Sequence, residues 1–140
     1  MASFIAGLRN YLLSDATISG LLGTNRIYCG KAPKTATSPY VILQRVSGSA
    51  RYGLSDLDGQ DDNYWQIDVW STSYSDCETL RIAIRTQLNG KYEITMGDYA
   101  VHSVTEEDSR ETSEPDGDGS EKVWYRNSSD FTIIRDSNET

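Results

Sequence analysis

Residue types that build catalytic and metal sites are scarce in this chain. It has one histidine, His102, and two cysteines, Cys29 and Cys77, among 140 residues. A single histidine excludes a metal centre built from several histidines, and no spacing links His102 to a nucleophile and an orienting acid. Two cysteines far apart in the chain, with no secretion signal before them, predict reduced thiols rather than a disulfide.

Long apolar runs and positive charge are also in short supply. Arg9 interrupts the N-terminal segment MASFIAGLRNYLLSD, so we expect neither a signal sequence nor a membrane span, and a protein made in a cytoplasm. Lys and Arg number 13 against 21 Asp and Glu, a formal net charge of −8. This balance argues against a protein that binds nucleic acid by neutralising phosphates. It is compatible with a protein past which DNA must slide without sticking.

Known phosphate and calcium motifs are incomplete. Gly30-Lys31 lacks the preceding glycine and the following Ser or Thr of a phosphate-binding loop. The run DGDGS at residues 116–120 imitates the start of a calcium loop. Glu121 and Asn127 occupy the positions at which that loop needs a glycine and a bidentate carboxylate. We therefore predict no cofactor, no bound metal and no enzymatic activity.

Residues 63–90, NYWQIDVWSTSYSDCETLRIAIRTQLNG, carry the clearest pattern. Residues 64–70 alternate between two faces, which predicts a half-buried strand. The buried face of this strand consists of Trp65, Ile67 and Val69. A helix follows, with Ser75 and Glu78 as its expected capping box and Gly90 at its end. The apolar face of this helix consists of Cys77, Leu80, Ile84 and Leu88. Strand and helix should therefore cover one another, and with Leu8 and Leu12 form one core.

The flanking segments complete a single α+β domain over residues 1–140. The pattern predicts a first helix at residues 4–14 capped by Ser3, and a short helical turn capped by Asp15 or Thr17. Strands are expected at 39–48, 91–96 and 99–106, and a last long one after residue 121. We predict a mostly antiparallel sheet of about four to five strands with two main helices packed on one face.

Two polar stretches leave alternatives open. Residues 47–62, SGSARYGLSDLDGQDD, fit a long β-excursion or a loop that contacts a partner. Residues 106–121 hold eight acidic side chains and one arginine, which predicts a mobile loop or the tip of a long hairpin.

Several side chains have no obvious place in a monomer core, and exposed aromatic and aliphatic groups are enriched at interfaces. Coverage by loops is the alternative explanation. The candidate interface residues are Tyr52, Leu54, Tyr64, Trp70 and Ile82, with the acidic residues Asp108, Glu111, Glu114, Asp116 and Asp118.

The segments LRNYLLSD, ISGLLG, RIYCGKAP, PYVILQRVSG and WQIDVWSTSYSDCETLRIAIRTQLNG follow one another in an order that resembles a known family. This family comprises the small tail-completion proteins of long-tailed bacteriophages, also described as tail terminators or tail-to-head joining proteins. The most specific elements are Arg26-Ile27-Tyr28 with Ala32-Pro33, Pro39-Tyr40-Val41, and Gln66-Ile67-Asp68-Val69-Trp70 leading into the helix after Tyr74. The resemblance covers residues 4–90.

The resemblance implies an α+β fold with helices on one face of a mostly antiparallel sheet. It also implies a homo-hexameric ring in the virion, at the tail–neck junction, assembled in the host cytoplasm. Such a ring caps the tail tube protein, joins it to the head-side connector and lets DNA pass. The family has no catalytic residues to carry over. Two other interpretations remain: a soluble adaptor that binds proteins through residues 47–62 and 106–121, and a hydrolase without a recognisable motif.

Overall fold

The computed structural model describes residues 3–23, 26–52, 57–115 and 122–136, and their side chains except those of 48–52 and 57–61. Its helices are α1 (Phe4–Leu13), α2 (Ala16–Leu22) and α3 (Tyr74–Leu88). Its strands are β1 (Ile27–Cys29), β2 (Tyr40–Tyr52), β3 (Leu57–Ser71), β4 (Tyr92–Met96), β5 (Tyr99–Pro115) and β6 (Val123–Asp136).

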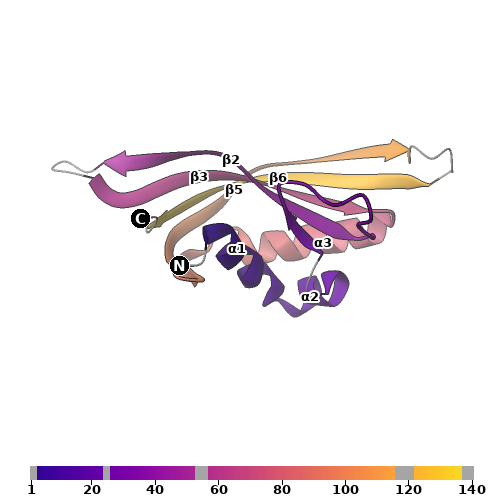
Figure 1. Cartoon of the computed structure of the whole chain (residues 1–140), viewed down its shortest axis with the longest axis horizontal. Coiled ribbons are helices and arrows are strands. Elements are labelled where there is room, and N and C mark those ends of the chain that lie inside the picture. The colour runs from indigo at the N-terminus through magenta and orange to yellow at the C-terminus, as the bar shows by residue number, and fades with distance from the viewer. Residues whose placement is uncertain (1–2, 24–25, 53–56, 116–121, 137–140) are drawn as a thin grey trace.

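The strands form one six-stranded sheet in the order β1-β2-β3-β6-β5-β4. β1 and β2 are parallel, and every other neighbouring pair is antiparallel. All three helices lie on one face of this sheet (Figure 1). The predicted α+β class and helix placement are therefore confirmed. The sheet has six strands where about four to five were predicted, and the additional strand is β1, whose 3 residues carry little periodic signal. The predicted short helical turn is the seven-residue helix α2.

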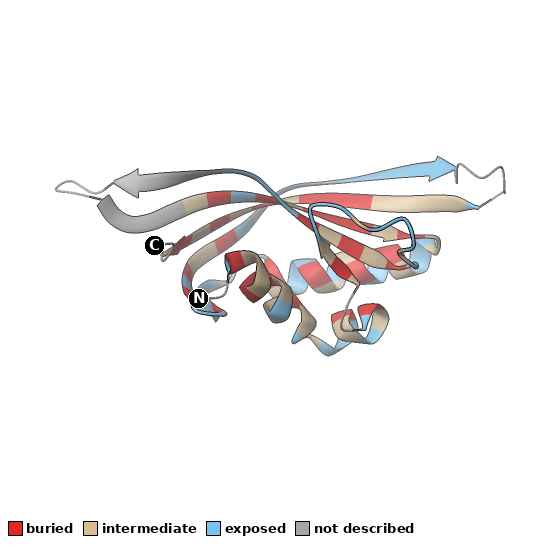
Figure 2. Ribbon diagram, viewed as in Figure 1, coloured by how far each residue is buried: buried red, intermediate tan, exposed pale blue. Residues whose placement is uncertain are grey.

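The core lies between the helices and the sheet, where buried residues concentrate (Figure 2). Every side chain that the sequence predicts for it is at most 4% exposed. These residues are Leu8, Leu12, Trp65, Ile67, Val69, Leu80, Ile84 and Leu88. β6 adds Phe131 and Ile133, and β5 adds Val101 and Val104. The period-2 and helical patterns thus identify the faces that pack together.

Local side-chain caps begin each helix. Ser3 accepts a hydrogen bond from the Ala6 amide, and Asp15 accepts one from the Ile18 amide, as the sequence predicts. α3 begins two residues earlier than predicted, because Ser73 accepts from the Asp76 amide. The prediction of a capping box formed by Ser75 and Glu78 is therefore wrong.

Helix α1 approaches the β4–β5 turn very closely. A Cβ atom built on Gly7 would lie 2.7 Å from the Met96 carbonyl oxygen and 3.1 Å from the Gly97 nitrogen. Real Cβ atoms do not approach backbone this closely, so only glycine fits at this point of α1. By contrast, a Cβ on Gly20 of α2 would meet nothing within 4 Å.

Two long β-hairpin arms extend beyond the helices in opposite directions (Figure 1). β2 and β3 form one arm, so the β-excursion interpretation of residues 47–62 is the one that the structure supports. β5 and β6 form the other, with Glu114 opposite Trp124 and Pro115 opposite Val123. The mobile-loop interpretation is therefore wrong for residues 106–115, because pairing with β6 supplies the backbone partners that the acidic sequence suggested were missing. Residues 116–121 lie outside the described part of the chain.

Candidate functional site

An aromatic cluster covers part of the sheet face that carries no helix. Tyr40 lies at its centre, with ring centroids 6.0 Å from Tyr28, 6.2 Å from Trp70 and 5.7 Å from Trp124. These spacings suit offset and edge-on aromatic pairs. Trp70, which the sequence marks as lacking a core, thus has intramolecular partners from β2 and β6.

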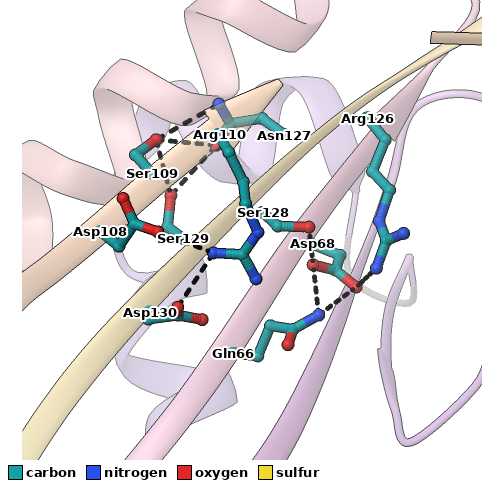
Figure 3. Close-up of polar contacts among 10 residues, drawn as sticks. All are labelled: Gln66, Asp68, Asp108, Ser109, Arg110, Arg126, Asn127, Ser128, Ser129 and Asp130. Atoms are coloured by element: carbon teal, nitrogen blue, oxygen red, sulfur yellow. Dashed lines mark hydrogen bonds and ion pairs between the residues drawn. The ribbon is translucent and has the colours of Figure 1, made fainter. Parts of the chain in front are cut away.

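A buried carboxylate network continues from this cluster along the same face (Figure 3). Asp68, 5% exposed, accepts hydrogen bonds from Ser128 Oγ at 2.7 Å and Arg126 Nη2 at 3.0 Å. Gln66 Nε2 donates to both carboxylate oxygens at 3.1 Å. The Arg126 guanidinium lies 5.2 Å from the centroid of the Trp70 ring. The network therefore locks β3 to β6 and holds the aromatic cluster from one side.

Two further sets of polar contacts join β5 to β6, one on each face of the sheet (Figure 3). Ser129 Oγ donates to Asn127 Oδ1 at 3.0 Å, and Ser109 Oγ lies 3.3 Å from Ser129 Oγ. Arg110 Nη1 bridges Asp108 at 3.1 Å and Asp130 at 3.0 Å. These contacts explain how a strand with the sequence NSSD can run through the middle of a sheet, since buried polar groups need partners.

The predicted acidic residues do not act as one group. Glu111 faces α3, where Tyr74 Oη donates to its carboxylate at 3.2 Å. A hydrogen bond to Glu78 raises the pKa of Glu111, and a hydrogen bond from Arg81 lowers the pKa of Glu78. Asp108 pairs with Arg110, and Glu114 is exposed at the far end of β5.

Tyr64 borders an open groove of about 610 Å³. Tyr64 is 43% exposed and Val46, on the neighbouring strand, is 60% exposed. Glu107, Arg110 and Thr132 line the opposite side of the groove. The groove therefore combines an exposed apolar rim with a charged one.

Ile82 projects from the outer side of α3. It is 51% exposed and borders shallow hollows with Thr79 and Thr86. On this helix Leu80 and Ile84 are buried, so Ile82 takes no part in the core. Ile82 and Tyr64 belong to different surfaces of the molecule, one on the helices and one on the sheet.

The remaining candidates fall at or beyond the ends of described segments. Tyr52 is the last residue of β2, and its side chain is outside the description. Leu54, Asp116 and Asp118 lie outside the described residues.

The single histidine contacts two carboxylates, and the thiol of Cys77 is buried. His102 Nε2 lies 2.7 Å from Asp136 Oδ1, and Nδ1 lies 3.5 Å from Glu93 Oε1. The hydrogen bond with Asp136 raises the pKa of His102. Burial raises the pKa of the Cys77 thiol to about 11, which suppresses the nucleophilic thiolate.

Over the described ranges, no three His, Cys, Asp or Glu side chains are placed to share a metal ion. None of the helices described has the length and apolarity to cross a membrane.

Sequence reasoning missed the contributions of Tyr40, Trp124 and Arg126 to the sheet face. The available signal was the apolar second face of residues 40–42 together with Trp70 on the same side of its strand. That signal cannot show which strands are neighbours, because strand order is not local information.

Comparison with known proteins identifies the fold and the family of the chain. A chain of a structure titled "Virion of native gene transfer agent (GTA) particle" has the same fold, with a TM-score of 0.65 and 14% sequence identity. The alignment covers 96% of this chain and 95% of that chain. No curated protein sequence matches. The family model described as "Tail completion protein gp17" matches residues 6–135. The chain therefore belongs to the tail completion protein gp17 family, and is a structural tail protein of a bacteriophage-type virion.

Proposed function

We propose that this protein forms a homo-hexameric ring at the tail–neck junction of a virion. The ring caps the tail tube protein, joins it to the head-side connector and leaves a central passage for DNA. The observation that carries the proposal is the family match over residues 6–135, nearly the whole chain. Assembly takes place in the host cytoplasm, and the protein has no catalytic turnover.

The charge of the chain suits a passage for DNA. A net charge of −8 gives the surface a field that repels phosphates. The three acidic candidates in β5, Asp108, Glu111 and Glu114, are all exposed. A DNA duplex can therefore move past the ring without the counterion release that drives tight binding.

Exposed apolar side chains on two different surfaces suit a closed ring. In a cyclic assembly, one surface of each subunit contacts a different surface of the next, so each contact is repeated around the ring. Ile82 lies on the helical side, whereas Tyr64 and Val46 lie on the sheet. Trp70, with its neighbours Tyr40 and Trp124, extends the sheet surface.

The substitution Ile82→Asp tests this assignment. The variant should fold, because Ile82 is not in the core, and should fail to form rings, because each contact would contain a new charge. Tyr92→Asp is the matched control, since Tyr92 is 73% exposed on the edge strand β4 and lines neither the groove at Tyr64 nor the hollow at Ile82. Circular dichroism measures folding, mass photometry measures rings, and reconstitution measures head-to-tail joining.

Two results would contradict the interface. One is an Ile82→Asp chain that does not fold. The other is an Ile82→Asp protein that joins heads to tails as well as the wild type does. Loss of rings in the Tyr92→Asp control would show that any added surface charge blocks assembly.

A further inference from the structure

Two stretches of the sheet have an open outer edge. β2 pairs with β1 only at residues 41–43, so its residues 44–52 have no outer neighbour among the described strands. β5 pairs with β4 at residues 99–103. The Lys91 backbone and the Asn89 side chain then hold Val104 and Glu106. Residues 107–115 pair with β6 on one side and have no described strand on the other side.

The two open edges carry opposite charge. Residues 44–52, QRVSGSARY, include Arg45 and Arg51 and no acidic residue. Residues 107–115, EDSRETSEP, include four acidic residues and one arginine. Opposite charges on neighbouring strands stabilise pairing and like charges oppose it. A β5 edge should therefore avoid the β5 edge of another copy and favour a β2 edge.

Strand direction also suits this pairing. β5 runs antiparallel to β6, β6 antiparallel to β3 and β3 antiparallel to β2, so β5 and β2 of one chain are antiparallel. A neighbouring copy in the same orientation would thus add its β2 to β5 and continue the antiparallel sheet.

The offset between the two edges sets the tilt of such a sheet. Gln44 and Asp108 lie in one row across the strands, through Gln66 and Asp130. From that row the open edge of β2 runs one way and that of β5 the other, along the two arms of Figure 1. Closed sheets have this stagger when their strands tilt by about 35–45° from the axis.

We propose that copies of this chain join by strand addition, with residues 44–52 of one copy pairing with residues 107–115 of the next. The inference rests on the proposed ring and deepens it. A long open strand edge is a template for another chain, and here the edge of a second copy fills it.

Charge reversal on each edge tests the joint. Arg45→Glu with Arg51→Glu should abolish the ring species in mass photometry, and so should Glu107→Lys with Glu114→Lys. A chain that carries all four substitutions should recover rings, because each joint then has both signs exchanged. Lys31→Glu with Lys34→Glu is the matched control for the arginine pair, since these exposed lysines lie outside both edges and change the net charge by the same amount and sign. This control should form rings.

Hydrogen–deuterium exchange separates strand addition from a general charge effect. Amides in residues 44–52 and 107–115 should exchange more slowly in the ring than in dilute wild-type monomer. Wild-type rings with no added protection in either stretch, or rings that survive both reversed pairs, overturn strand addition and leave the proposed ring intact. Strand addition is also overturned if the variant with all four substitutions does not recover rings. The same holds if the β5 amides are protected from exchange only when another virion protein binds. A wild type that never forms rings overturns both proposals.

Discussion

Two isoleucines on helix α3 provide a direct test of the packing. Ile84 is 3% exposed and Ile82 is 51% exposed, two residues apart on the same helix. Replacing Ile84 by Ala removes three buried carbon atoms, which at about 0.8 kcal/mol each costs about 2.4 kcal/mol in transfer free energy. The cavity left among the core side chains adds to this, so we expect Ile84→Ala to lose about 2–4 kcal/mol of unfolding free energy.

The same change at Ile82 should cost less than about 0.5 kcal/mol, as surface substitutions usually do. Urea unfolding followed by tryptophan fluorescence measures both variants, at a protein concentration low enough to exclude assembly. With an m-value of about 2 kcal/mol/M, the midpoint of Ile84→Ala should fall by about 1–2 M. A loss below about 0.5 kcal/mol for Ile84→Ala, or equal losses for both variants, would refute the packing of α3 on the sheet.

Three further predictions concern a close contact, a thiol and an ionisable contact. Gly7→Ala should destabilise the fold by about 1–3 kcal/mol, because the added methyl group overpacks the contact with the β4–β5 turn. Gly20→Ala should stabilise the fold by up to about 1 kcal/mol through helix propensity. Thermal unfolding measures both variants, and stabilisation by Gly7→Ala would contradict the close approach of α1. In native protein at pH 8, a thiol reagent should modify the exposed Cys29 and leave the buried Cys77 unreacted until denaturant is added; two fast thiols would show that α3 opens. Because the folded pKa of His102 is raised above its ordinary value of 6.5, its stabilising contacts should be complete below that pH and lost as pH rises through the folded pKa. The stability difference between wild type and His102→Gln should therefore shrink from pH 6 to pH 8, and a difference that grows over this range would refute the ion-pair assignment.

A sequence pattern predicts the structure correctly where the feature depends on a single helix or strand. The alternation of Trp65, Ile67 and Val69 reports the buried face of β3 whatever lies beside it. The caps at Ser3 and Asp15 involve groups within three residues of each other, so the sequence predicts them correctly. The cap of α3 was predicted two residues too late because STSYSD offers several side-chain oxygens that could accept the bond, and in the structure Ser73 accepts it from the Asp76 amide.

The sequence by itself determined the α+β class, the helix-bearing face of the sheet, the core residues and the acidic surface. It also carried enough of the family pattern for the chain to be placed among phage tail proteins. Only the tertiary structure decided that residues 107–115 form a strand, that Trp70 stacks with Tyr40, and that β2 and β5 each keep an open edge. The physical reason is that hydrophobic period reports which face of an element is buried, whereas strand order depends on partners far away in the chain.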